Sequence, residues 1–148
     1  MLILAKSTQF SVVSLLVDKV FQMVYTLSMS IPAKIKLSTL NDGKAVSGRI
    51  SFSQDKIALM FAHEGDSFLI TVRDNSMRVK KTGALSYDMT FKENSLSPVT
   101  LSTDQGTLKE FYMTTHSLRF TRKNDFFSAQ AVYSFDLSTD EKEITLEC

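Results

Sequence analysis

The chain has 148 residues, of which 43% are hydrophobic and 22% are charged, a composition that fits one globular domain and leaves no room for two of ordinary size. Seventeen Lys and Arg against sixteen Asp and Glu leave a net charge of +1, so the chain lacks the excess positive charge that drives general binding to nucleic acid or anionic membranes. A single Cys and two His exclude an internal disulfide and a structural Cys/His zinc site, and they favour a reducing, cytoplasmic location.

Residues 1–30 differ in character from the rest of the chain. They contain only three charged side chains, Lys6, Asp18 and Lys19, and no Gly or Pro. Their apolar residues recur at a spacing close to that of a helix with one apolar face. These residues are Phe10, Val13, Leu16, Val17, Val20 and Val24. Because Asp18 and Lys19 interrupt the apolar run, it falls short of the about 20 residues that cross a bilayer, and we expect no stable membrane insertion.

Three interpretations of this segment stay open. It is a secretory signal or membrane anchor, a helix that packs on the domain or lies at an interface, or a stretch upstream of a true start at Met23 or Met29. We therefore divide the chain into an apolar N-terminal segment at 1–30, either a helix or a non-native extension, and a single β-barrel domain at 31–148.

From Ile31 onward, hydrophobic and polar residues alternate with period two, as they do in strands that bury one face. The alternating segments are, in chain order, 31–37, 46–52, 57–63, 68–72, 77–81, 85–91, 99–103, 108–114, 118–120, 131–137 and 144–146. In the clearest segment we expect four side chains to point into one core. These are Leu85, Tyr87, Met89 and Phe91. Short runs of Asn, Asp and Gly separate the segments and predict tight turns.

Roughly ten short strands joined by tight turns predict an all-β, antiparallel meander. An open sheet of that length would expose its edges and one apolar face, so it should curl into a closed barrel or split into a sandwich. A barrel of eight or more strands has an interior just large enough to be filled by side chains or to hold a small ligand. From the alternation alone, a closed barrel and a sandwich both stay open, and a helical N-terminal segment is an open addition to either.

Several short motifs follow one another in a fixed order. They are Lys81-Thr82-Gly83, Met89-x-Phe91, Thr103-Asp104-Gln105-Gly106-Thr107-Leu108, Thr115-x-x-Leu118 and Tyr133-x-Phe135-x-Leu137. In order and spacing they resemble the YwiB-like family of small uncharacterised bacterial β-barrel proteins over residues 31–148, most strongly over 77–137. Two motifs depart from the family pattern, since Lys81 stands where Arg is usual and 101–106 lacks two aromatic rings. The resemblance implies a calycin-like barrel, related in shape to the lipocalins, and implies no reaction because the family has no established activity.

Sequence signatures of catalysis are missing. The chain has no Gly-rich phosphate loop, no His-Glu-x-x-His, no Gly-x-Ser-x-Gly and no calcium loop. His63 and His116 are candidates for an acid/base pair, but each falls at a predicted strand end, where a hydrogen-bonded or solvated histidine is the usual outcome. We therefore expect no enzyme activity, no catalytic residue, no cofactor and no metal.

Four side chains are candidate ligand contacts because the alternation points them toward the interior. These are Lys81, His63, Tyr87 and Tyr133. Lys81 lies at a strand end with inward parity, and an ammonium group there needs a partner. It is either half of a structural ion pair that closes the barrel end, which we favour, or an anion contact at a ligand mouth. The two tyrosines are either core residues with a satisfied hydroxyl or ligand contacts.

Two basic groups also stand out. The first comprises Arg73, Arg78, Lys80 and Lys81, and the second comprises Arg119, Arg122 and Lys123, near Phe120, Phe126 and Phe127. Cations beside aromatic rings are typical of surfaces that bind single-stranded nucleic acid. Interleaved acidic residues and a net charge near zero favour an ordinary solvated face instead.

The function that we expect is a non-enzymatic barrel, monomeric or homodimeric, that binds a small, partly apolar ligand in its interior and no specific nucleic acid. The alternative is a protein or nucleic-acid interaction module that uses the outer basic face and has a filled interior. Interior volume separates the two, because an empty apolar cavity with a few polar groups supports the first.

Overall fold

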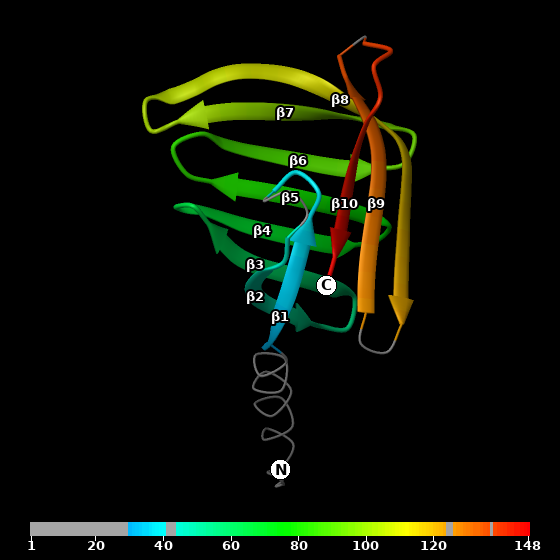
Figure 1. Cartoon of the computed structure of the whole chain (residues 1–148). Coiled ribbons are helices and arrows are strands. Elements are labelled where there is room, and N and C mark those ends of the chain that lie inside the picture. Colours follow the sequence, from blue (N-terminus) through cyan, green and yellow to red (C-terminus); the bar gives the residue numbers. More distant parts are fainter. Residues whose placement is uncertain (1–29, 41–43, 124–125, 137) are drawn as a thin grey trace, which may run out of the picture.

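Ten antiparallel strands form one closed barrel in the computed structural model, which describes residues 30–40, 44–123, 126–136 and 138–148 (Figure 1). The strands are β1 (Ser30–Leu37), β2 (Val46–Phe52), β3 (Lys56–His63), β4 (Asp66–Arg73), β5 (Ser76–Thr82), β6 (Ser86–Lys92), β7 (Ser95–Thr103), β8 (Gly106–Lys123), β9 (Phe126–Phe135) and β10 (Lys142–Glu147). Neighbours in the chain pair with each other, and β1 pairs with β10. The predicted all-β meander is confirmed, whereas the helix predicted within 1–30 lies outside the described residues apart from Ser30.

The hairpin turns use residues that the sequence pattern marks as separators. Glu64 and Gly65 join β3 to β4, and Asp74 and Asn75 join β4 to β5, all with positive φ. Gly adopts this left-handed backbone without strain, and Asp and Asn tolerate it better than most other residues. Two-residue turns of this kind match the twist of antiparallel strands, so the local sequence sets the register of these hairpins.

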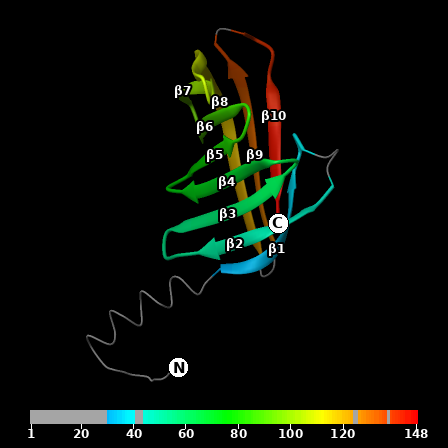
Figure 2. The ribbon, with the colours of Figure 1, turned by 90° about the vertical axis from the view of Figure 1, so that its left-hand side faces the viewer.

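β8 is one strand of 18 residues, although the alternation predicts separate strands at 108–114 and 118–120. Its pairing with β9 shifts between Thr115 and Ser117, so His116 is the extra residue of a β-bulge. The first part of β8 runs beside β7 and the second part turns to run beside β9 (Figures 1 and 2). The prediction of two strands is wrong because the bulge breaks the alternation without ending the strand.

The bulge changes which residues of β8 face the interior. Before it, the odd-numbered Met113 and Thr115 are buried, and after it the even-numbered Leu118 and Phe120 pack against the core. One inserted residue shifts a period-two alternation by one position, which moves the inward face from odd to even numbers. The register with β9 extends this parity to Arg122, which pairs with the buried Phe127, although the last three residues of β8 are exposed.

Inward-facing side chains fill the middle of the barrel with one continuous apolar cluster. Its largest fully buried members are Phe91, Ile35, Leu37, Leu59, Ile70, Met77, Met113 and Leu146. They come from strands all round the ring, so burial of these side chains holds the two sides of the barrel together.

The prediction for residues 85–91 is correct for three of its four side chains. Phe91 is fully buried and Met89 nearly so, and Tyr87 packs half-buried against the core. Leu85 is 40% exposed, so its predicted place in the core is wrong. β6 begins only at Ser86, and Leu85 lies in the preceding turn, where strand alternation no longer determines direction.

The residues around Gly48 leave no room for a side chain. A Cβ on this residue of β2 would lie 2.6 Å from the Met60 carbonyl oxygen, 2.7 Å from Ile35 Cδ1 and 2.8 Å from Phe61 Cβ. These contacts are too short for any side chain, so Gly is required here by space and not by its backbone angles. The absent side chain lets Ile35 fill the interior beside β2.

The ring closes through a short contact between β1 and β10. The two strands share only two residue pairs in register, Lys36 with Glu147 and Leu37 with Leu146. A hydrogen bond from the Ser38 amide to the Thr145 carbonyl extends this contact beyond the end of β1. β1 shares six such pairs with β2. The first half of β1 therefore separates from β10 while it stays paired with β2, so the described strands leave the ring unclosed at the N-terminal end of β1.

The core assignment of β6 predicts that substitutions at two adjacent residues change the free energy of unfolding by very different amounts. Met89→Asp places an unpaired carboxylate in the core and is expected to lower the free energy of unfolding by about 3 kcal/mol or more. Thr90→Asp, on the other face beside Arg78, is expected to change it by less than about 0.5 kcal/mol. Urea titrations of both variants measure these values, and equal stabilities would contradict the assignment.

Candidate functional site

Three of the four candidate ligand contacts meet at one end of the barrel. His63, Lys81 and Tyr87 line a pocket of about 490 Å³, which we call the polar-end pocket. Its remaining lining residues are Thr39, Leu40, Glu64, Asp66 and Phe68. The pocket lies where the β1–β2, β3–β4 and β5–β6 connections meet, because an antiparallel meander brings alternate turns to the same end.

Lys81 is paired in this pocket. Its Nζ lies 3.4 Å from Asp66 Oδ2, with the two side chains 19% and 27% exposed, and 5.6 Å from the centre of the Tyr87 ring. A Cβ at Gly83 would collide with the Asp66 carboxylate, so the absence of a side chain at Gly83 leaves the carboxylate its room. The ion pair that we favour for Lys81 is present, and its positive charge is offset before any ligand arrives.

The two candidate tyrosines have different surroundings. Burial is the main cause that raises the pKa of Tyr87, with further contributions from Tyr133 and Asp66. Burial also raises the pKa of Tyr133. The Tyr133 ring packs edge-on against Phe91 at 5.2 Å and against Phe135 at 5.4 Å, and Tyr133 is not among the residues that line the polar-end pocket. Tyr133 is therefore a core residue, and Tyr87 alone of the two lines a pocket.

The two histidines are not brought together. His63 lines the polar-end pocket, with Nε2 3.5 Å from a Glu64 carboxylate oxygen. His116 lies in the bulge of β8 and shares a hydrogen bond of 2.8 Å with the Ser134 hydroxyl. Neither contact joins one histidine to the other, so the structure gives no geometry for an acid/base pair of His63 and His116.

Most cations of the first basic group have acidic partners. Arg73 lies 3.4 Å from Asp55, and Arg78 makes a two-pronged contact with Asp88 that includes a 2.9 Å hydrogen bond from Nε. This contact raises the pKa of Arg78 and lowers that of Asp88. Lys81 is also paired, at the polar end, so three of the four cations in this group each have a carboxylate partner and the group does not form a continuous basic surface.

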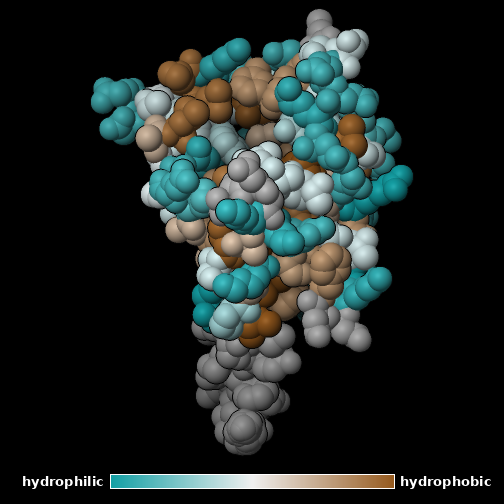
Figure 3. All heavy atoms as spheres, in the orientation of Figure 1, coloured by the Kyte–Doolittle hydropathy of each residue, from teal (hydrophilic) through white to brown (hydrophobic). Residues whose placement is uncertain are grey.

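Exposed hydrophobic residues are spread over the outer surface. Leu96 and Tyr112 lie on β7 and β8, and Met60 and Leu69 lie on β3 and β4. Figure 3 shows hydrophobic side chains along the upper edge, over β7 and β8, and at the lower end beside β1. Single exposed residues are common on protein surfaces. Met60 and Leu69 are paired neighbours that line an open surface pocket, and the lower end beside β1 contains another pocket.

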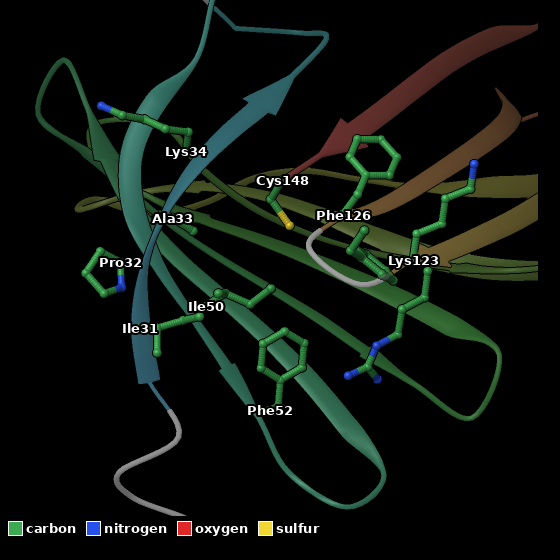
Figure 4. Close-up of a pocket in the computed structure, with 11 residues that line it drawn as sticks. Ile31, Pro32, Ala33, Lys34, Ile50, Phe52, Lys123, Phe126 and Cys148 are labelled. Carbon is green, nitrogen blue, oxygen red and sulfur yellow. The ribbon is translucent and has the colours of Figure 1, made fainter.

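At the opposite end of β1, a pocket of about 360 Å³ opens where β1 has left β10 (Figure 4). We call it the open-end pocket. Its lining residues are Ile31, Pro32, Ala33, Lys34, Ile50, Phe52, Arg122, Lys123, Phe126, Phe127 and Cys148. Figure 4 shows Ile50, Phe52 and Cys148 turned toward its middle, and the ammonium groups of Lys34 and Lys123 turned away from it.

Strand parity explains the chemistry of the open-end pocket. Ile50 and Phe52 continue the inward face of β2, and Phe127 that of β9, so the walls extend the apolar core to the barrel end. On β8 the bulge at His116 gives the inward face even numbers, and this brings Arg122 to the pocket. The Arg122 guanidinium lies 4.9 Å from the centre of the Phe52 ring. The described lining residues include three cations and no acidic side chain.

Arg122 was missed as a site residue, since the sequence pattern assigned it to an outer basic face. It shares the even-numbered parity of Leu118 and Phe120, and this parity was the available signal. The parity does not reveal that β8 continues as far as Lys123, or that the end of β2 lies opposite.

Cys148 contributes a neutral group to the open-end pocket. Its amide and carbonyl exchange hydrogen bonds with Phe127 at 2.9 and 2.8 Å, which fixes the residue beside β9. Burial raises the pKa of its thiol from 9.0 to about 11, although cations lie among the lining residues. The thiol is therefore protonated at neutral pH and acts as an apolar wall group.

In residues 30–40, 44–123, 126–136 and 138–148, no three His, Cys, Asp or Glu side chains are grouped so as to hold a metal ion. The same part of the chain contains no helix of the length and apolar character needed to cross a membrane.

The described residues define a closed, ten-stranded antiparallel β-barrel with a filled middle and a pocket at each end. No protein-family model matches the chain, and no curated protein matches its sequence. The crystal structure of the ywiB protein from Bacillus subtilis is similar, with a TM-score of 0.61 and 14% identity over 84% of this chain and 94% of that chain. This similarity supports a YwiB-like fold, as the sequence motifs indicate.

The ion pair at the polar end predicts a specific loss of stability. Lys81→Met keeps the apolar stem but leaves Asp66 without its partner, and it is expected to lower the free energy of unfolding by about 1–3 kcal/mol, between values for exposed and buried pairs. Lys92→Met, at an exposed position on β6, serves as the control. In urea titrations, the free energy of unfolding that the double variant Lys81→Met/Asp66→Asn loses should be smaller than the sum of the losses in the two single variants. An unchanged stability of Lys81→Met would argue against a structural role for the pair.

The raised pKa of Cys148 predicts slow alkylation in the folded protein. A shift from 9.0 to about 11 lowers the thiolate fraction at pH 8 by about a hundredfold. Iodoacetamide should therefore react much more slowly with the folded chain than with the urea-unfolded chain. The folded rate should keep rising with pH between 9 and 11, where the unfolded rate levels off, and parallel pH profiles would contradict this.

Proposed function

We propose that this chain is a non-enzymatic, calycin-like barrel protein that binds a small, partly apolar ligand in the open-end pocket. The observation that supports this most directly is the continuity of the pocket with the core. Where β1 leaves β10, the inward faces of β2 and β9 extend past the buried cluster to solvent as apolar walls. A concave apolar site with a few polar groups at its rim is the usual form of a small-molecule site.

The volume of the open-end pocket limits the ligand. At about 360 Å³ it is at the lower end of the range for small-molecule sites, and the middle of the barrel is occupied by side chains. The ligand is therefore held at the barrel end and is not enclosed at the centre. A short hydrocarbon or a single ring system matches this space.

The polar-end pocket is the weaker candidate for the same ligand. Its cation, Lys81, is already paired with Asp66, and its lining is mainly polar. A partly apolar ligand would have to compete with that ion pair and would bury little apolar surface. We assign Lys81 and Asp66 a structural role at this end.

The alternative of an interaction module that uses the outer basic face has less support. Arg73, Arg78 and Lys81 each have a carboxylate within ion-pair distance. Charges that are balanced one by one contribute little to the long-range attraction that brings nucleic acid to a surface.

Filling the open-end pocket tests the proposed function. Ala33 lines the pocket opposite Gly48, so Ala33→Phe should occupy the space and abolish binding. Ala84→Phe, at an exposed turn position, is the matched control. Native mass spectrometry of protein purified from its own cells should show a retained adduct on the wild type and the control, and none on Ala33→Phe. Circular dichroism confirms that all three proteins are folded.

A titration with octanol, followed by backbone amide shifts, supplements this experiment. Shifts should be largest for Ala33, Phe52 and Phe127, which surround the pocket. The absence of both an adduct and octanol-dependent shifts in the wild type would contradict the proposed function.

A further inference from the structure

The exposed side chain of Arg122 places its guanidinium over the Phe52 ring at the open-end pocket. It lies 4.9 Å from the centre of the Phe52 ring, a separation typical of an attractive contact between a cation and an aromatic face. Such a contact uses the face of the ring and leaves the N–H groups of the guanidinium available as donors. Phe52 is itself a wall of the pocket, so Arg122 lies at the boundary between apolar wall and solvent.

The charged side chains among the described residues that line the open-end pocket are all positive. Lys34 and Lys123 lie on its rim, with Lys34 Nζ donating a hydrogen bond of 2.9 Å to Ser47 Oγ. Among the described lining residues none is acidic, and the protonated Cys148 thiol carries no charge. This differs from the polar-end pocket, which contains two carboxylates, Asp66 and Glu64.

From this arrangement we infer that the ligand of the open-end pocket is an anionic amphiphile, with a carboxylate or phosphate head group bound by Arg122 and a short apolar body between Ile50, Phe52 and Phe127. The inference rests on the proposed function and names its ligand class. A planar guanidinium offers two parallel N–H donors that match the two oxygens of a carboxylate or phosphate. The two lysines raise the local concentration of anions without contacting the head group.

The head group and the apolar body of the ligand contribute separately to its affinity, so each contribution is measured with a ligand that lacks the other. The apolar walls bind any short hydrocarbon, whereas Arg122 discriminates between a charged and a neutral head. Wild-type protein should bind octanoate about tenfold more tightly than octanol, and octyl phosphate at least as tightly as octanoate. Inorganic phosphate alone, which lacks the body, should not displace octanoate at equal concentration.

Arg122→Gln is the decisive variant, and Arg119→Gln is its matched control because Arg119 is an exposed arginine of the same strand outside the pocket lining. Arg122→Gln should weaken octanoate binding about tenfold and change octanol binding by less than about twofold. Arg119→Gln should change neither. Amide shifts in titrations of the full chain, below micelle-forming concentrations, measure all of these affinities.

The outcomes separate the inference from the function on which it rests. If octanol binds as tightly as octanoate and Arg122→Gln changes neither, the head-group inference is overturned while the pocket remains a ligand site. Equal losses in Arg122→Gln and Arg119→Gln would show a general charge effect and would also overturn the role of Arg122. If neither amphiphile binds but a short oligothymidylate shifts the Arg122 and Phe126 amides, the proposed function fails and the surface binds nucleic acid.

Discussion

Closure of the ring between β1 and β10 is the constraint on which the rest of this structure depends. A ten-stranded meander left open would expose two sheet edges and its whole apolar face, so the two end strands must meet. They do so through two residue pairs at the C-terminal half of β1, against six pairs between β1 and β2. This short contact completes the core, and it leaves the first half of β1 free to form one side of the open-end pocket.

The two ends of the barrel consequently differ in chemistry. At the polar end, the connections between strands bring Asp66 against Lys81, and an ion pair fits beside Gly83. At the open end, none of the described connections covers the inward faces of β2 and β9, and apolar side chains such as Phe52 line a pocket together with cations. A paired charge is already neutralised, whereas a cation with no acidic side chain among the described residues that line its pocket attracts anions. Ligand chemistry is therefore expected at the open end.

A single bulge connects the fold to the site. The extra residue His116 lets β8 pass from β7 to β9 and reverses its inward parity. Without that reversal, odd-numbered residues would face the interior beyond the bulge, and Arg122 would point outward. The bulge is stabilised by the hydrogen bond of His116 to Ser134 and by the Asn94 amide, which donates to the Thr115 carbonyl. The orientation of the candidate head-group residue thus depends on a contact made far from the pocket.

Local alternation and turn chemistry by themselves determined the all-β class, most strand positions and tight turns such as Asp74–Asn75, because each depends on residues close in the chain. They also placed Lys81 on an inward face, which the tertiary structure completed by supplying Asp66 as its partner. The prediction that Leu85 lies in the core was wrong because alternation holds only inside a strand, and β6 starts one residue later. The open-end pocket and the place of Arg122 in its lining were decided only by the tertiary structure. Alternation specifies the face of the sheet on which a side chain lies. The open-end pocket also requires side chains from β1, β2, β8 and β9 to lie close together, and the way in which the ring closes sets the distances between them.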